Sequence, residues 1–597
     1  MLTINADEAI TRNYDVIIVG SGAGGGQMAF TLTLAGIKCL MLEAGRAYDP
    51  VTETPMFQRR DQAPLLGTST PDKQFFGFHD ATIDGGWEME AEPYTQASDK
   101  PEEQFWWWRA RMLGGRTNHW GRISLRNGPY DFKPKTRDGL GLDWPINYEE
   151  IEPYYTKVEQ LIGVYGSNEG LENTPNSPEG VLQPPPKGRA GELLAQKHGK
   201  TLGIPIIPIH RAVLTQKLDA DTLPAKLFPG NTWAQKIVGD SMRARAACFW
   251  ATPCGRGCST GANYQSTTVH LPPALATGNL DIVANAHVRE VLVGPDGKAT
   301  GVMFIDKTTG NDVQVNAKAV VLAASSGETV RIMLNSKSSL FPDGIANGSG
   351  LVGKYIMDTV GTSLQGQIPA LENLPPYNED GAGGSHFYAP WWLYREAEKL
   401  GFPRGYHIEM GATRGMPGGG NPLPDDLGAG AYGTKYKQEA RRYYGSFMGF
   451  ACRGEMIPND DCFAELDDTV KDKWGVPVLK WHWKWAEHEQ RMCDHAELTF
   501  RELIETMGGT VRTVTTGRNR IDPGGKIIHE VGGAIMGSER NTSVCNGFNQ
   551  TWEVKNLFLV DGTPFPSNAD KNPTLTIMAL AWRAGDYLVE QSRRGLL

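Results

Sequence analysis

Short apolar runs bounded by glycine recur along the chain, and the first run sets the pattern. Residues 14–19, Tyr-Asp-Val-Ile-Ile-Val, are nearly all apolar and end at Gly20, which predicts a strand buried on both faces of a parallel sheet. A helix is predicted over 26–35, and a second strand over 38–42 that ends at Glu43. The order strand, helix, strand is typical of half of a doubly wound α/β unit.

Similar runs predict the later elements. The expected strands are 280–284, 288–293, 301–305, 319–324, 479–485 and 556–560, and the expected helices begin near Glu328 and cover 573–590. Residues 356–525 differ in character, with Gly/Pro-rich loops around 414–430, and we expect them to face the substrate. A chain of 597 residues is longer than one ordinary domain, so at least two structural units are expected.

Composition and charge argue against several classes of protein. A formal charge of −9 gives no sign of the basic stripe that nucleic-acid binding requires. The chain contains no apolar run of about eighteen residues, so no membrane-spanning helix is expected. Residues 1–13 include Asp7 and Glu8 and no apolar stretch, unlike a secretory signal. Eight cysteines are too few for a disulfide scaffold in so long a chain.

A glycine-rich turn lies between the first predicted strand and helix. Gly20-Ser-Gly22-Ala-Gly-Gly25 matches G-x-G-x-x-G, and Glu43 follows eighteen residues after the last glycine. The glycines would let the backbone approach a pyrophosphate, the helix N-terminus would supply amide donors, and Glu43 could accept hydrogen bonds from a ribose. The turn indicates a dinucleotide site, either FAD or NAD; a glycine turn in an unrelated α/β fold is the alternative.

Three cysteines stand close together in a Gly/Pro-containing loop. Cys248, Cys254 and Cys258 have the spacing C-x5-C-x3-C, and three thiolates on a tight loop suit iron bridged by sulfide. With three ligands, a [3Fe-4S] cluster is the better match. The alternatives are a Cys₃His zinc site with His270, or a loop of buried thiols or one disulfide.

Motifs far from the turn resemble the glucose–methanol–choline (GMC) oxidoreductases. They are His529-Glu-Val-Gly-Gly-Ala-Ile-Met-Gly537, Asn556-Leu-Phe-Leu-Val-Asp-Gly562, Asn572-Pro-Thr-Leu-Thr576, Gly114-Gly115 with His119-Trp120, and residues 320–328, 455–458 and 471–477. The resemblance spans nearly the whole chain and implies FAD. It also implies the GMC fold, an α/β (α+β overall) architecture in which a Rossmann-like FAD-binding domain is interleaved with a substrate-binding domain built on an antiparallel sheet.

On this resemblance the FAD-binding domain is discontinuous. It would comprise 1–135, 248–355 and 526–597, including the cysteine loop, while 136–247 and 356–525 would form the substrate-binding domain and insertions.

The resemblance also assigns roles to individual residues. His529 and Asn572 would face the flavin N5 edge, with His529 as the general base, because a neutral imidazole has a pKa near the working pH. In some sugar-oxidising relatives the histidine that corresponds to His119 bonds covalently to the flavin 8α-methyl group; a plain active-site wall histidine is the alternative. The expected cofactor-binding residues are Gly20, Gly22, Gly25, Glu43, Gly114, Gly115, Asn118, His119, Val288, Asp561, Gly562, Asn572 and Thr574.

The segment 113–122, with 130–133 and 143–146, looks most like the catalytic subunits of bacterial glucoside 3-dehydrogenases, and the spacing of Cys248, Cys254 and Cys258 resembles that in bacterial FAD-dependent glucose dehydrogenases. This implies oxidation of the C3 hydroxyl of glucosides, with electrons passing through the cysteine loop to an external acceptor. The alternatives are an oxygen-using sugar oxidase, a dehydrogenase of glucose, gluconate or fructose, and an enzyme acting on lipid or steroid alcohols. The implied partners are a small export subunit and a c-type cytochrome, and the implied compartment is the periplasm, otherwise the cytoplasm.

Overall fold

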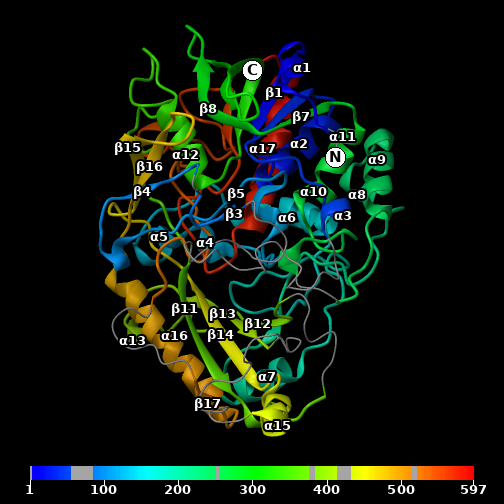
Figure 1. Cartoon of the computed structure of the whole chain (residues 1–597), viewed down its shortest axis with the longest axis vertical. Coiled ribbons are helices and arrows are strands. Elements are labelled where there is room, and N and C mark those ends of the chain that lie inside the picture. Colours follow the sequence, from blue (N-terminus) through cyan, green and yellow to red (C-terminus); the bar gives the residue numbers. More distant parts are fainter. Residues whose placement is uncertain are drawn as a thin grey trace.

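The computed structural model describes residues 3–54, 85–89, 91–250, 254–375, 384–412, 432–512 and 521–596. Two sheets dominate, at opposite ends of an elongated molecule: a mixed sheet beside both termini and an antiparallel sheet at the far end (Figure 1). The predicted loops around 414–430 lie outside the described residues. Within the described part of the chain, no helix combines the length and apolar character needed to cross a membrane.

The mixed sheet has the strand order β7-β2-β1-β10-β9-β8, with β18 also paired to β10. Its strands are β1 (Tyr14–Val19), β2 (Cys39–Glu43), β7 (Leu280–Ala284), β8 (Ala286–Val293), β9 (Ala299–Asp306), β10 (Asp312–Leu322) and β18 (Leu557–Leu559). The first half of β10 pairs antiparallel with β9, and its second half pairs parallel with β1 and β18. Segments from three distant parts of the chain therefore build one sheet.

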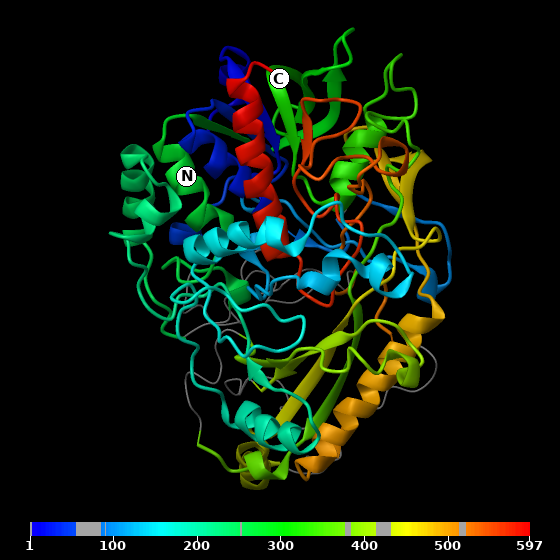
Figure 2. The same cartoon turned by 180° about the vertical axis from the view of Figure 1, so that it is seen from behind.

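Both faces of β1 are covered, which explains its unbroken apolar sequence. Val16 and Ile18 belong to one hydrophobic cluster, whereas Ile17 and Val19 belong to another on the opposite face. Helix α2 (Ala23–Leu34) follows β1 directly, and α17 (Thr574–Arg593) packs along α2. Helix α17 also packs against α6 (Tyr148–Ile162), as seen from behind in Figure 2.

The antiparallel sheet has the order β17-β11-β14-β13-β12-β6. Its strands are β6 (Ile207–Pro208), β11 (Val360–Gln367), β12 (Phe387–Ala389), β13 (Tyr406–Gly411), β14 (Phe447–Gly454) and β17 (Thr510–Val511). Helix α16 (Glu487–Thr506) covers one face through apolar residues at helical spacing, Met492, Cys493, Ala496, Phe500 and Leu503. Tyr406 reaches this helix, and its hydroxyl group lies 3.1 Å from Thr499.

Alternate residues of β13 therefore point away from α16. His407 and Glu409 lie on that opposite face, and the strand register places His407 beside Arg453 of β14.

The remaining strands form two small sheets. One contains β15 (Phe463–Lys471), β16 (Pro477–His482) and β4 (Thr95–Gln96), and the other contains β3 (Gly85–Gly86) and β5 (Arg109–Ala110). The remaining longer helices are α7 (Ala190–Thr201), α9 (Thr232–Arg243), α12 (Ser326–Asn335) and α15 (Gly433–Tyr443).

The observed architecture is the predicted one. A largely parallel sheet with covering helices is combined with an antiparallel sheet, and the predicted strands over 14–19, 280–284 and 556–560 are present as β1, β7 and β18. The exact division into two domains stays a prediction.

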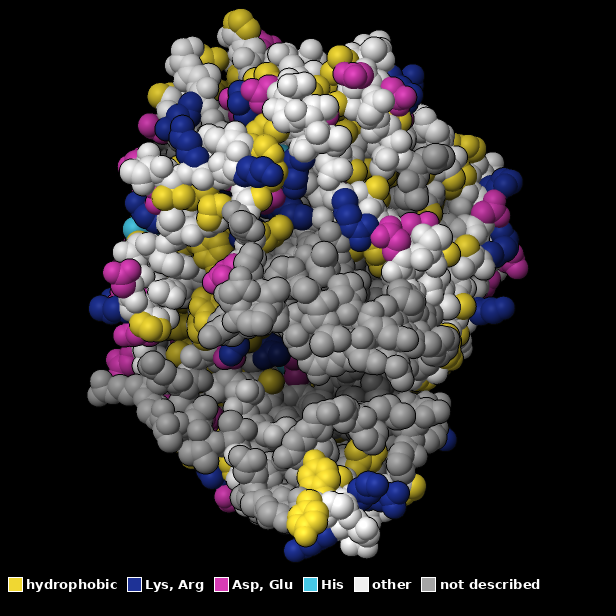
Figure 3. Space-filling model, viewed as in Figure 1, with side chains coloured by type: hydrophobic (Ala, Val, Ile, Leu, Met, Phe, Trp, Pro, Cys, Tyr) yellow, Lys and Arg dark blue, Asp and Glu magenta, His cyan; other side chains and the backbone are white. Residues whose placement is uncertain are grey.

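On the face shown in Figure 3, Lys and Arg side chains are interspersed with Asp and Glu over the described surface.

Candidate active site

One cavity of about 260 Å³ runs from the glycine turn after β1 to His529 and Asn572. Gly20 has a φ of +97°, and a Cβ atom there would lie 2.4 Å from the carbonyl oxygen of Ala323. Gly22 is the N-cap residue of α2, so no side chain caps the helix there, and there is open space where a Cβ atom would stand. Uncapped amides at a helix N-terminus beside open space suit the phosphates of a dinucleotide.

The remaining glycines of the turn let α2 pack closely on the sheet. A Cβ on Gly24 would lie 2.0 Å from the carbonyl oxygen of Val560, and one on Gly25 would lie 2.0 Å from that of Gly20. Gly25 is thus a packing residue behind the turn, the role of the third glycine in this motif.

Glu43 lies at the end of β2, where the sequence predicts a ribose contact. Its carboxylate lines the cavity and accepts hydrogen bonds from the backbone amide of Gly45, at 2.8 Å, and from the amide and hydroxyl groups of Ser21. Burial raises the pKa of this carboxyl group. Glu43 therefore also braces the glycine turn through Ser21, which sequence reasoning did not anticipate.

His529 and Asn572 meet at the opposite end of the cavity. Asn572 Nδ2 lies 3.2 Å from His529 Nε2, and His529 Nδ1 lies 3.0 Å from Thr359 Oγ1. An amide N–H can only donate, so Nε2 is the acceptor and Nδ1–H donates to Thr359. The backbone amide of His529 also donates to Asp358, at 2.9 Å.

This arrangement keeps the His529 imidazole neutral. Burial, reinforced by the positive charge of Arg453, lowers its pKa from 6.5 to about 3. Nε2 is therefore unprotonated and can accept a proton. The other amide atom of Asn572, Oδ1, is buried without a hydrogen-bond partner among the described residues. Because the one lone pair of Nε2 accepts the N–H of Asn572, a ligand hydroxyl group must displace that N–H to reach Nε2.

Polar side chains of the antiparallel sheet face this pair. Glu409 and Arg453 form an ion pair of 2.9 Å, and both act electrostatically on His529. His407 donates from Nδ1 to the backbone carbonyl of Asp570, two residues before Asn572. Sequence reasoning missed these residues, and also Asp358 and Thr359, because they stand singly in strands and loops without a motif.

Most predicted cofactor-binding residues line the cavity. They are Gly20, Gly22, Glu43, Gly115, His119, Val288, Asp561, Gly562, Asn572 and Thr574. Gly25, Gly114 and Asn118 lie behind its wall. The amide of Gly114 donates to Ser21, and Asn118 donates to the carbonyl of Leu113. The observed positions suit a cofactor, although the individual contacts stay predictions.

His119 forms part of the cavity wall. Its ring packs edge-on against Trp108, with the ring centroids 5.5 Å apart, and its Nε2 atom lies 3.3 Å from the sulfur of Met112. Both His119 and Trp108 are buried and line the cavity. The predicted covalent bond to flavin stays a prediction.

The three cysteines lie beside this wall rather than in the cavity. A Cβ on Gly255 would lie 3.7 Å from the carbonyl oxygen of His119, so the cysteine loop touches the His119 loop. All three thiols are unbridged, so the alternative of one disulfide receives no support. Among the described residues, their ligand atoms do not form a group as compact as a tetrahedral zinc site requires.

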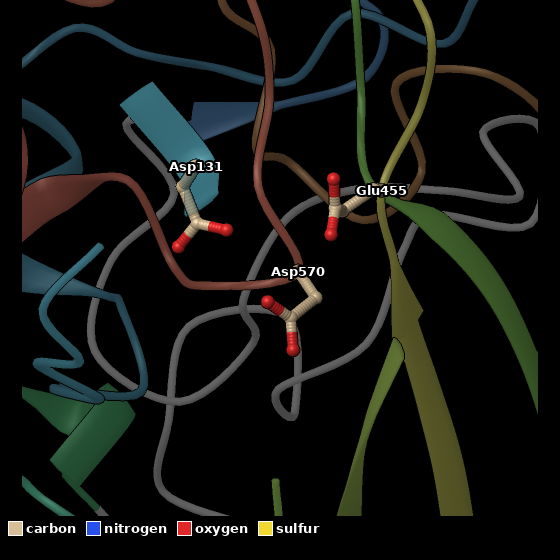
Figure 4. A group of neighbouring side chains, drawn as sticks. All are labelled: Asp131, Glu455 and Asp570. Carbon is tan, nitrogen blue, oxygen red and sulfur yellow. The ribbon is translucent and has the colours of Figure 1, made fainter. Parts of the chain in front are cut away.

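A buried group of carboxylates supports the loop that carries Asn572. Asp131 of α4 (Pro129–Phe132), Glu455 after β14, and Asp570 converge from three segments (Figure 4). The ammonium group of Lys571 lies 3.0 Å from Asp131 and 2.5 Å from Asp570. Burial raises the pKa of Glu455 to about 7, against the opposing charge of Arg137. Because nearby cations compensate the carboxylates, we interpret the group as an ion-pair network.

Comparisons with known proteins identify the family of the chain. Two GMC oxidoreductase family models match, an N-terminal one over residues 232–357 and a C-terminal one over 458–581. The 2-methyl-1,2-propanediol dehydrogenase of Mycolicibacterium austroafricanum is 30% identical, covering 98% of this chain and 96% of the relative. The fructose dehydrogenase large subunit of Gluconobacter japonicus is 26% identical, covering 98% and 99%.

Solved structures agree on the fold. A mutant form of the formate oxidase of Aspergillus oryzae RIB40 superposes with a TM-score of 0.63 at 13% identity, covering 98% of this chain and 99% of the other. The cavity fits the cofactor of this family, because a glycine-lined helix N-terminus opens at one end and an unpartnered amide oxygen lies at the other end of its described wall. The chain therefore belongs to the GMC oxidoreductases, FAD enzymes that act on the CH–OH group of their donors.

Proposed function

We propose that the protein is an FAD-dependent dehydrogenase that oxidises a secondary hydroxyl group of a sugar, the C3 hydroxyl of a glucoside, and passes the electrons to an external acceptor. One observation carries the chemistry: at one end of the cofactor cavity the unprotonated Nε2 of His529 lies beside Asn572, whose Oδ1 atom has no partner among the described residues. The substrate hydroxyl group takes the place of the Asn572 N–H at Nε2. When bound, FAD supplies the hydride acceptor. His529 takes the hydroxyl proton at Nε2, so the CH–OH carbon becomes a carbonyl carbon and the electron pair leaves with the hydride.

Thr359 and Asn572 orient the base. The hydrogen bond from Nδ1–H to Thr359 keeps Nε2 as the proton acceptor, and Asn572 can accept from the same hydroxyl group without titrating. Glu409, Arg453 and His407 add polar groups on the facing sheet, which suits a substrate with several hydroxyl groups.

The cysteine loop supports a dehydrogenase over an oxidase. We propose that Cys248, Cys254 and Cys258 hold a [3Fe-4S] cluster, because three thiols at this spacing on one loop suit iron bridged by sulfide. The same loop lies against the backbone of His119 at the cavity wall. An iron–sulfur centre beside a flavin provides a route for single electrons to another carrier. The proposed carrier is a c-type cytochrome, with a small export subunit and a periplasmic location as the resemblance implies.

A second substrate class has a specific observation behind it. A relative at 30% identity over 98% of this chain is a dehydrogenase of 2-methyl-1,2-propanediol, so a short diol is the alternative donor. Fructose follows from the second relative.

Anaerobic titration of the purified holoenzyme tests the proposal. A panel of methyl glucoside, glucose, gluconate, fructose and 2-methyl-1,2-propanediol is added while flavin absorbance is followed. We expect methyl glucoside to bleach the flavin fastest and its product to be the 3-keto sugar. Fast bleaching by the diol alone would overturn the sugar assignment.

Oxygen and a dye separate a dehydrogenase from an oxidase. With substrate present, we expect rapid dye reduction without oxygen and little peroxide in air. Rapid peroxide formation without any other acceptor would contradict the proposed electron route.

Acid precipitation tests the covalent bond to His119. If that bond exists, flavin stays with the precipitated protein, and His119→Ala releases it. Complete release from the unmodified protein would leave His119 as a wall residue only.

A further inference from the structure

Three buried arginines surround the cysteine loop. Arg122, Arg211 and Arg245 are exposed by 0%, 2% and 5%, respectively. Among the described residues, none of them has a carboxylate within ion-pair distance, whereas most other buried arginines do, for example Arg126 with Glu159 at 2.6 Å. Buried charges in proteins are normally paired, so three unmatched guanidinium groups point to an anion that they share.

Arg211 makes the most direct approach to the cysteines. Its Nη2 atom lies 3.9 Å from the sulfur of Cys254, within the range of a hydrogen bond to sulfur, and also donates to the carbonyl of Gly121 at 2.7 Å. Its Nη1 atom donates to the carbonyl of Ser385 at 3.3 Å. These backbone contacts fix the guanidinium plane against the thiol.

Arg122 joins the cysteine loop to the cofactor cavity. Its Nη1 atom donates to the carbonyl of Cys254 at 2.7 Å, and its Nη2 atom donates to the carbonyls of Thr117 and Asn118 at 3.2 and 3.1 Å. Those two residues immediately precede His119. One guanidinium group thus bonds both to the cysteine loop and to the segment that precedes His119 in the cavity wall.

Arg245 links the segment after the cysteine loop to the end of α6. It donates to the carbonyls of Gly261, Leu161 and Ile162 at 2.9, 3.0 and 2.6 Å. Burial lowers the pKa of Arg245 to about 10, and the nearby Cys258 opposes this shift. Apart from the contact between Arg211 and the sulfur of Cys254, these hydrogen bonds go to neutral carbonyls, so they do not neutralise the three positive charges around the loop.

We propose that Arg122, Arg211 and Arg245 form a cationic cage that stabilises an anionic [3Fe-4S] cluster on Cys248, Cys254 and Cys258 and raises its reduction potential. The inference rests on the proposed function. A cluster with three thiolate ligands is negatively charged and becomes more so when it gains one electron. Nearby positive charge and hydrogen bonds to sulfur favour that reduced state, so the cage promotes electron transfer out of the reduced flavin.

Redox titration of the holoenzyme, followed by electron paramagnetic resonance, tests the cage. The variants are Arg211→Gln, which removes the charge, and Arg211→Lys, which keeps it. Arg243→Gln is the control, because this exposed residue of α9 loses the same formal charge where solvent screens it. Iron, sulfide and FAD contents are measured in parallel.

We expect Arg211→Gln to shift the cluster potential to more negative values, or to lose iron while keeping FAD. Arg211→Lys should keep the cluster with a smaller shift, and Arg243→Gln should match the unmodified protein. An unchanged potential in Arg211→Gln with full iron would overturn the cage, as would equal loss of iron in both Arg211 variants. An unmodified protein without iron would instead overturn the proposed cluster itself.

Discussion

At the residue scale, the proposed chemistry depends on how His529 is held. Its backbone amide is fixed by Asp358, its Nδ1 atom by Thr359 and its Nε2 atom by Asn572. A ring fixed at both nitrogens cannot flip, so the nitrogen that faces the cavity is always the same one. The motif around His529 could be found in the sequence, whereas Asp358 and Thr359 could not, because a side chain that supports another residue needs no recurring pattern of its own.

Replacement of His529 should separate chemistry from cofactor binding. We expect His529→Ala to keep FAD bound and to slow flavin reduction by about 10²-fold or more, the range that loss of a general base gives. Stopped-flow absorbance measures the rate. Thr359→Val should cause a smaller loss, because the base remains but one of its orienting hydrogen bonds is gone. An unchanged rate in His529→Ala would remove this residue from the mechanism.

The lowered pKa of His529 predicts the pH dependence. Because the imidazole binds a proton only near pH 3 rather than 6.5, Nε2 stays available as a base throughout the range from 5 to 8. Flavin reduction should therefore show no loss with an apparent pKa near 6.5 as the pH falls from 8 to 5. A loss near 6.5 that disappears in His529→Ala would show that burial does not keep this ring neutral.

At the scale of elements, sequence patterns predicted the mixed sheet well. Apolar runs buried on both faces produce an unambiguous signal, and β1 begins and ends at the residues expected. The antiparallel sheet was expected only through the family resemblance, because one face is polar and β13 mixes His407 and Glu409 with apolar residues. The pairing between β13 and β14 joins residues about forty positions apart, and no local pattern specifies such a pairing.

The contact between α2 and the sheet predicts a sensitive glycine. We expect Gly24→Ala to lower FAD occupancy and thermal stability, because its Cβ would lie 2.0 Å from the backbone oxygen of Val560, and the helix must shift. Gly449→Ala on β14 is the matched control, since no atom lies within 4 Å of its Cβ position. Flavin content and thermal unfolding measure both effects. Equal behaviour of the two variants would show that α2 moves without cost.

At the scale of the whole molecule, the carboxylate network ties the two sheets together. Glu455 follows a strand of the antiparallel sheet, Asp131 belongs to α4, and Asp570 and Lys571 precede Asn572 (Figure 4). The position of Asn572 therefore depends on charges contributed by three distant segments. No sequence motif predicts this network, because its members come together only after the whole chain has folded.

Removing the central cation should destabilise this junction. We expect Lys571→Met to cost about 3 to 5 kcal/mol, the range for breaking a buried ion pair from one side, because Asp131 and Asp570 lose their shared partner. Lys157→Met is the control, since its pair with Asp586 at 3.6 Å is partly exposed and should contribute about 1 kcal/mol or less. Denaturant unfolding compares the two; a similar small loss in both would contradict the role of the network.

The position of β18 has a consequence for the order of assembly during synthesis. This strand supplies residues 557–559 to the mixed sheet, where it pairs with the second half of β10, and Asp561 follows it into the cofactor cavity. Until residues 557–559 have been synthesised, the edge of β10 that pairs with β18 has no partner from that strand. It can then pair with strands of other chains. Nascent chains should therefore depend on a chaperone, and should load flavin only after residue 574, where α17 begins, has left the ribosome.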